Sequence, residues 1–179
     1  MLINKIKNKW ICKTKLPIFV KYILIQTMDD SKLANVFLIN DQQYAITIES
    51  IIQIVRAVEV TIVPQAPPFI MGVVDYHGQI IPVMNIRYCL GLESKEVNVN
   101  DRFLILQTPK RIVAIVVDEI KDVITIDEVE KIKSTSLSDK IDFGYLIRLE
   151  SGIVFIYDIE RLISPETEEA INLMLESIK

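Results

Sequence analysis

No part of this sequence is apolar for long enough to cross a membrane as a helix. Half of the residues are hydrophobic and the mean hydropathy is +0.33, but every apolar stretch is short and is interrupted by Asp, Glu, Lys or Asn. A membrane-spanning helix needs about 20 consecutive apolar residues. The short stretches are instead typical of buried strands, so the sequence predicts a globular protein without direct membrane insertion.

Aromatic residues and cysteines are also scarce. Phe, Trp and Tyr make up 7% of the chain, so the predicted core consists mainly of Ile, Val and Leu, and β-branched side chains favour strands. The two cysteines, Cys12 and Cys89, lie far apart and share no metal-ligand spacing with His77, which is the only histidine. This pattern favours inert thiols over a disulfide or a metal site.

The sequence also lacks the motifs that catalysis and cofactor binding require. It contains no glycine-rich phosphate loop, and no Ser or Cys nucleophile motif surrounds His77, which leaves only a pairing with Cys89 or Asp75 as a catalytic alternative. We predict no catalytic residue, no cofactor and no metal site. One acidic set lacks the spacing of a calcium-binding loop and is expected on a solvated face: Asp118, Glu119, Asp122, Asp127, Glu128 and Glu130.

Positive charge is concentrated at the N-terminus. Residues 1–27 contain six lysines and no acidic residue, which leaves 14 basic against 24 acidic residues, a net charge of −10, in the rest of the chain. That acidic remainder argues against a nucleic-acid-binding barrel, which needs a basic groove. Lys21 splits the apolar residues 16–25, which disfavours a secretory signal, whereas a basic membrane-surface anchor stays open. We predict that residues 1–33 are a poorly integrated extension, with Met28 as an alternative start.

An internal repeat organises the middle of the chain. A strand–turn–strand pattern begins with residues 37–39 and recurs from residues 103–105, with Ala45 matching Ala114. Each copy continues into an Ile/Val-rich segment and then a second hairpin with a glycine at its turn. Short, regularly spaced strands are typical of barrels or sandwiches. Because each copy is too small to bury its apolar surface well, we predict two small β-barrels that share a core.

Two proline-containing segments give further expectations. Ser164-Pro165-Glu166 is typical of a helix start, so we predict an amphipathic C-terminal helix over residues 164–179. Its buried face is expected to consist of Ala170, Leu173, Met174 and Ile178. Pro82 lies inside a predicted strand and cannot donate a ladder hydrogen bond, so that position should be an edge or a bulge.

Four segments resemble the CheW family. Residues 67–73 (PPFIMGV) resemble its Pro, Phe, Ile, any residue, Gly, Val run, and residues 78–83 (GQIIPV) resemble its Gly-to-Pro-Val strand. Ile86-Arg87 resembles a Leu-Arg pair, and residues 116–120 (VVDEI) resemble a Val-Asp segment. The resemblance covers residues 34–165. It implies a mainly β fold of two SH3-like five-stranded barrels in tandem with a shared core, short helices and the C-terminal helix, with subdomains at about 34–95 and 100–163.

The resemblance also implies a function. CheW-like proteins are non-catalytic chemotaxis adaptors that bind the regulatory domain of a CheA-type histidine kinase and the cytoplasmic tip of chemoreceptors. We therefore expect a scaffold in the cytoplasm, associated with receptor arrays at the inner membrane face. The alternatives are a CheW-like adaptor of a non-flagellar motility pathway and a small barrel that binds nucleic acid.

The chain departs from the family at polar positions. Its hairpin turn reads Asp75-Tyr76-His77-Gly78, where the family usually has Asn-Leu-Arg-Gly, and Gln53 and Asn85 stand where the family often has Glu and Asp. Histidine lacks the permanent charge and the bidentate fork of arginine. The candidate partner-binding residues are Ile51, Gln53, Ile54, Asp75, Tyr76, His77 and Gly78.

Overall fold

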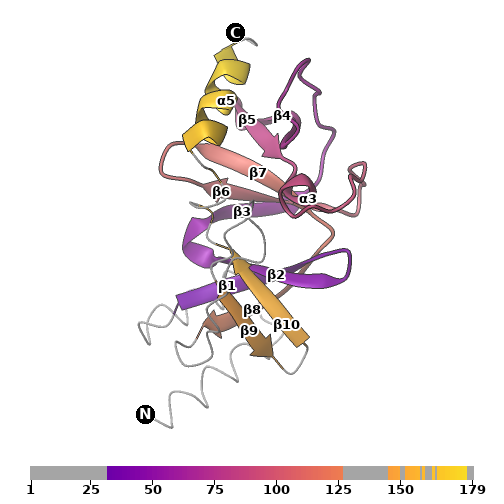
Figure 1. The fold of residues 1–179 in the computed structure, drawn as a ribbon, viewed down its shortest axis with the longest axis vertical. Helices are drawn as coiled ribbons and strands as arrows, with labels where there is room; N and C mark the ends of the chain where they lie inside the picture. Colours follow the sequence, from indigo (N-terminus) through magenta and orange to yellow (C-terminus); the bar gives the residue numbers. More distant parts are fainter. Residues whose placement is uncertain are drawn as a thin grey trace.

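The computed structural model describes residues 32–126, 145–149, 152–157, 159, 163 and 165–176. These residues form two five-stranded sheets, which lie one above the other in Figure 1. The predicted mainly β fold with two small barrels is confirmed. No helix in the described part of the chain is long and apolar enough to cross a membrane.

The first sheet, barrel 1, has the strand order β8-β1-β2-β10-β9. Its strands are β1 (Lys32–Ile39), β2 (Gln42–Thr47), β8 (Glu119–Ile126), β9 (Tyr145–Leu149) and β10 (Gly152–Tyr157). The second sheet, barrel 2, has the order β3-β6-β7-β5-β4. Its strands are β3 (Ile51–Arg56), β4 (Ile70–Tyr76), β5 (Gln79–Met84), β6 (Arg102–Gln107) and β7 (Ile112–Val117). The helices are η1 (Ile48–Ser50), α3 (Ile86–Cys89) and α5 (Pro165–Glu176).

Each barrel combines strands from both copies of the repeat. The first copy supplies β1–β5, but only β1 and β2 belong to barrel 1; the second copy supplies β6–β10, but only β6 and β7 belong to barrel 2. The predicted subdomains, 34–95 and 100–163, are therefore not the units that the sheets form. Only η1 separates β2 from β3, and only Asp118 separates β7 from β8. The chain therefore passes from barrel 1 to barrel 2 at η1 and returns to barrel 1 at Asp118.

The exchange gives the two barrels equivalent pairing patterns. In barrel 1, β2 is antiparallel to β1 and parallel to β10; in barrel 2, β7 is antiparallel to β6 and parallel to β5. Ala45 and Ala114, which occupy matching positions in the two copies of the repeat, are both fully buried inside their barrels. Phe37 and Phe103 are not equivalent, because Phe37 faces the shared core and Phe103 the interior of barrel 2.

The core lies in three layers: two barrel interiors and a shared core between the barrels. Alternate strand residues face opposite sides. In β6, Phe103 and Ile105 fill barrel 2, while Leu104 and Leu106 face the shared core. Strands buried on both faces explain the continuous apolar runs in the sequence, and the predicted shared core is confirmed.

Helix α5 packs on barrel 2 with a buried face that agrees with the prediction at Met174 but not at Leu173. Ile171 and Met174 are buried, but Leu173 is 64% exposed. Arg111, before β7, donates from Nε to Glu168 Oε1 at 2.6 Å and from Nη2 to Asn172. This ion pair orients the helix so that positions 168, 171 and 174 face inward. Ser164 and Ile178 lie outside the described residues.

The structure bears on two details of the sequence prediction. The described part of β1 begins at Lys32, with Leu33 buried, and residues 1–31 lie outside the described residues, so the predicted boundary at residue 34 stays a prediction. Strand β5 is an inner strand rather than an edge, but the β4–β5 ladder has a register shift between Ile70 and Gly72, next to the pair of Val73 with Pro82. Its ladder with β7 pairs only Val83 and Met84, so Pro82 lies just before the ladder and its missing amide is tolerated.

Candidate partner-binding site

The tip of the β4–β5 hairpin is a tight turn that presents polar side chains to solvent. His77 and Gly78 both have positive φ angles, 54° and 82°, as a two-residue turn of type I′ requires. Asp75 Oδ1 accepts a hydrogen bond of 2.6 Å from the amide of Gly78, which locks the turn. The side chains of Asp75 and His77 are exposed. The turn therefore holds His77 at a fixed place on the surface.

A side-chain hydrogen bond connects this turn to the far edge of the same sheet. Tyr76 Oη donates to Gln53 Oε1 at 2.9 Å, although β3 and β4 are the two outer strands in the order of barrel 2. The rings of His77 and Tyr76 form a T-shaped contact, with centroids 4.5 Å apart and an angle of 67° between the ring planes. The structure thus brings five of the predicted residues into one place, the hairpin surface: Gln53, Asp75, Tyr76, His77 and Gly78.

The other two predicted residues lie elsewhere. Ile51 and Ile54 are partly buried against the shared core. A β-bulge between Ile51 and Gln53 shifts the register and leaves Ile52 44% exposed instead. Ile80, opposite Asp75 on β5, is 46% exposed. The periodicity of the sequence does not reveal a bulge, so the exposure of Ile52 was not predictable from the apolar pattern.

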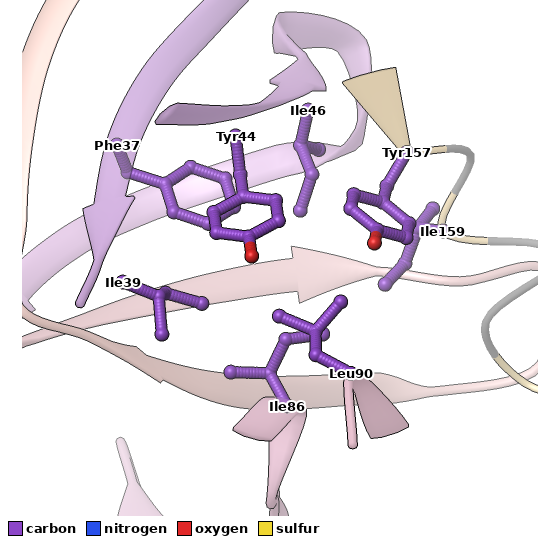
Figure 2. Close-up of a pocket in the computed structure, with 8 residues that line it drawn as sticks. All are labelled: Phe37, Ile39, Tyr44, Ile46, Ile86, Leu90, Tyr157 and Ile159. Atoms are coloured by element: carbon purple, nitrogen blue, oxygen red, sulfur yellow. The ribbon is translucent and has the colours of Figure 1, made fainter. Parts of the chain in front are cut away.

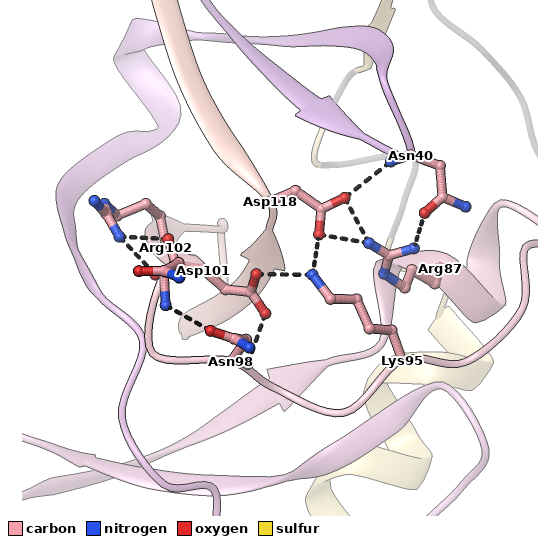
Figure 3. Close-up of polar contacts among 8 residues, drawn as sticks. Asn40, Arg87, Lys95, Asn98, Asp101, Arg102 and Asp118 are labelled. Atoms are coloured by element: carbon pink, nitrogen blue, oxygen red, sulfur yellow. Dashed lines mark hydrogen bonds and ion pairs between the residues drawn. The ribbon is translucent and has the colours of Figure 1, made fainter.

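A polar network that the sequence did not predict connects the two barrels (Figure 3). Arg87 of α3 is only 8% exposed and donates from Nη2 to both carboxylate oxygens of Asp118, each at 2.6 Å. Its Nη1 donates to Asn40 Oδ1 at 2.6 Å. Lys95 Nζ lies 2.7 Å from Asp118 Oδ1 and 2.9 Å from Asp101 Oδ1. We call Asn40, Arg87, Lys95, Asp101 and Asp118 the inter-barrel network.

The charges in this network stabilise one another. Burial alone would raise the pKa of Asp118, but hydrogen bonds from Lys95, the amide of Asn40 and Arg87, together with the Arg87 charge, hold the pKa below its usual range. Burial alone would lower the pKa of Lys95, but hydrogen bonds to Asp118 and Asp101 raise it. Asp118 is therefore not part of a solvated acidic face as expected. Asp127, Glu128 and Glu130 of that set lie outside the described residues.

The inter-barrel network includes one residue from each of two segments that resemble the CheW family. Asn40 lies in the β1–β2 turn of barrel 1, Arg87 follows β5 of barrel 2, and Asp118 is the single residue at which the chain crosses from barrel 2 to barrel 1. Arg87 and Asp118 belong to two of the segments that resemble the CheW family. Because they are far apart in the sequence, their contact was not predicted. No motif or spacing in the sequence indicated the other members of the network, Asn40, Lys95 and Asp101.

A cavity at the boundary between the barrels is lined by apolar and aromatic side chains (Figure 2). Tyr44 and Tyr157 direct their hydroxyl groups towards Ile86 and Leu90, and these lining side chains leave no room for a water molecule. Burial raises the pKa of both tyrosine hydroxyls. Burial likewise raises the pKa of the Cys89 thiol, so this thiol has little thiolate character. Among the described residues, no group of three His, Cys, Asp or Glu side chains is placed to hold a metal.

These features define a class of protein: a tandem of SH3-like barrels that exchange strands and share a core. The fold is similar to the crystal structure of the scaffolding protein TtCheW from Thermoanaerobacter tengcongensis, with a TM-score of 0.69 and 22% identity over 78% of this chain and 92% of that chain. Residues 34–166 match the CheW-like domain, and the chain belongs to this family.

Relatives in other bacteria agree with this assignment. The chain is 28% identical to the chemotaxis protein CheW of Helicobacter pylori over 133 residues, which covers 73% of this chain and 80% of the relative. It is also 28% identical to the chemotaxis protein CheW of Bacillus subtilis over 138 residues, or 75% of this chain and 88% of the relative.

Proposed function

We propose that this protein is a chemotaxis adaptor that couples chemoreceptors to a CheA-type histidine kinase without catalysing a reaction itself. The match of residues 34–166 to the CheW-like domain is the observation that carries the proposal. Relatives named chemotaxis protein CheW support it. The partners we propose are the regulatory domain of the kinase and the cytoplasmic tip of the receptor. The adaptor would then act in the cytoplasm, at receptor arrays on the inner membrane face.

The mechanism would be positioning. A shared core and the buried Arg87–Asp118 pair join the barrels, so surfaces on the two barrels keep a fixed relative orientation. Holding the kinase and the receptor on one rigid adaptor raises their effective concentration for each other. A receptor state that binds the adaptor differently can then bias the kinase.

The hairpin surface is the proposed contact in barrel 2. Gln53, Tyr76 and His77 are held together by one hydrogen bond and one ring contact, so they form a preorganised surface in which Gln53 and His77 are exposed and Tyr76 is half-buried. Ile51 and Ile54 would support β3 from the core side rather than contact the partner. Because Gln53 and His77 replace groups that are often charged in the family and lack a permanent charge, this surface would use fewer charge-assisted hydrogen bonds.

Isothermal titration tests the proposal. The full chain is titrated with the regulatory domain of a CheA kinase from the same genome and, separately, with a receptor-tip fragment. We expect saturable binding to both fragments, and weaker binding to at least one of them in the Tyr76→Ala variant. Lys121→Ala is the matched control, because it alters an exposed ion pair on barrel 1. Failure of the unaltered chain to bind either fragment would contradict the proposed function.

A further inference from the structure

Two arginines face each other at one end of barrel 2. Arg56, the last residue of β3, is the register partner of Arg102, the first residue of β6. Directly opposed residues of an antiparallel pair have side chains on the same face, with Cβ atoms about 4.5–5.5 Å apart, and like charges there are destabilising. The next pair along this face is Ile54 with Leu104, which contributes to the shared core. The two arginines therefore lie where the shared core meets solvent.

Neither arginine is neutralised by an acidic side chain of the described chain. Every ion pair found among the described residues involves Arg87, Lys95, Arg111 or Lys121. Arg102 Nη1 instead donates to the carbonyl oxygens of Asn100 and Asp101, at 2.5 and 3.0 Å (Figure 3). These bonds orient the guanidinium group and use only Nη1, so within the described part of the chain its other nitrogen atoms stay available. Two unneutralised cations side by side contrast with the net charge of −10 carried by residues 28–179.

Exposed apolar side chains flank the pair. Val58 is 56% exposed and Val99 is 79% exposed. The amide of Ala57 donates to the carbonyl oxygen of Asp101 at 3.0 Å, so the chain beyond β3 runs beside the chain before β6. This contact brings the two valines to the same end of the barrel as the arginines. We call Arg56, Val58, Val99 and Arg102 the arginine patch.

We propose that the arginine patch binds a segment of a partner protein that carries carboxylates beside apolar side chains. Charge complementarity identifies this occupant: paired carboxylates would remove the repulsion between Arg56 and Arg102 and accept the guanidinium hydrogen bonds that the chain leaves available. The apolar side chains of the segment would cover Val58 and Val99. The patch is distinct from the hairpin surface, so this inference does not rest on the proposed function.

An NMR titration at low ionic strength tests the inference on the full chain. The probe is a short, end-capped peptide that repeats Glu-Glu-Val, and the matched peptide repeats Gln-Gln-Val. We expect amide shift changes around residues 56–58 and 99–102, with the glutamate peptide only. Arg56→Gln and Arg102→Gln should each weaken binding roughly fivefold. Arg148→Gln is the control, because Arg148 is an exposed arginine opposite the exposed Ile153 in barrel 1, and it should leave the affinity unchanged.

A stability measurement separates a binding role from a structural one. Arg56→Glu replaces repulsion with a cross-strand ion pair, so it should raise the melting temperature by about 1–3 °C while abolishing peptide binding. A lower melting temperature would show that Arg56 supports the fold, and the inference would fall. Equal binding of both peptides, or shift changes elsewhere, would also overturn it. So would an inert peptide combined with binding to phosphatidylglycerol vesicles that is lost in Arg56→Gln, because the occupant would then be a lipid surface.

Discussion

The two barrels have equivalent strand orders but contribute different side chains to the boundary between them. Barrel 1 provides aromatic rings: the centroid of Tyr44 lies 6.1 Å from that of Phe37 and 5.8 Å from that of Tyr157. Barrel 2 provides aliphatic side chains such as Leu104 and Leu106. The architecture therefore depends on the exchange of strands and on burial, and a repeated set of core residues is not required.

The barrels also differ in what they present to solvent. Barrel 2 carries the hairpin surface, where β4 reaches β3 through the Tyr76–Gln53 bond, and the arginine patch at the end of β3. Barrel 1 contributes Asn40 to the inter-barrel network and its aromatic residues to the shared core. We expect substitutions at the boundary to change stability and substitutions on the surfaces of barrel 2 to change binding.

The largest effect is expected from truncation at equivalent positions of the boundary. Phe37 pairs with the residue before Ala45, and Leu106 pairs with the residue before Ala114; both side chains are fully buried. Phe37→Ala should reduce the free energy of unfolding by about 3–5 kcal/mol and Leu106→Ala by about 2–5 kcal/mol. Urea unfolding measures both. If the barrels are coupled, each variant unfolds in one transition; two separate transitions would show that the shared core does not join them.

Removing the central cation of the inter-barrel network should have the next largest effect. Arg87→Ala leaves Asp118 without its closest partner, and breaking a buried pair costs about 3–5 kcal/mol. Because the Asp118 side chain is 25% exposed, we expect about 2–3 kcal/mol. Lys121→Ala is the control, since both side chains of the Lys121–Glu119 pair are exposed; it should stay within about 0.5 kcal/mol. Equal losses in both variants would mean that burial of the network has no energetic consequence.

The free energy of unfolding should depend on pH through the ionisation of Asp118 and Lys95. The pKa of Asp118 is lowered in the folded protein, so its contribution is present above the usual aspartate range and is lost as the pH falls through the lowered value. The pKa of Lys95 is raised, so its contribution is present below the usual lysine range and is lost as the pH rises through the raised value. Thermal unfolding across this range should show a shallower acid decline for Asp118→Asn than for the unaltered chain. An identical acid decline would exclude Asp118 as a contributor.

The smallest change in stability is expected at the hairpin surface. His77 is exposed at the tip of the turn, so His77→Arg should alter the free energy of unfolding by less than about 0.5 kcal/mol. It should nevertheless change the affinity for the kinase or receptor fragment, because arginine adds a permanent charge and a bidentate hydrogen-bonding fork that histidine lacks. Titrations of both proteins measure this. Unchanged affinity for both fragments would remove His77 from the proposed contact.

The sequence was sufficient for the architecture but not for the pairing of the strands. The repeat and the match of Ala45 with Ala114 predicted two barrels with a shared core, because alternation and burial are local properties. The exchange of strands was not predictable, since periodicity does not specify which sheet a strand joins. The same limit explains the false match of Phe37 with Phe103, which share a residue type but face different layers.

In the candidate site, too, local geometry was predictable from the sequence and contacts between distant segments were not. His77 is exposed at the tip of the turn, which the hairpin pattern predicts, because a short hairpin fixes its own geometry. The bond from Tyr76 to Gln53 and the pair of Arg87 with Asp118 required tertiary contacts between segments far apart in the chain. The exposure of Ile52 was not predictable, because the bulge that turns it to solvent leaves no trace in the apolar pattern.

Kinase autophosphorylation in a reconstituted system tests the central claim most directly. A CheA-type kinase and a receptor from the same genome are combined with and without this protein, and phosphate incorporation is measured with and without receptor ligand. The account predicts that the kinase responds to the receptor only when the protein is present, and that Phe37→Ala and Tyr76→Ala weaken the response while Lys121→Ala does not. A receptor response of equal size without the protein would contradict the adaptor function.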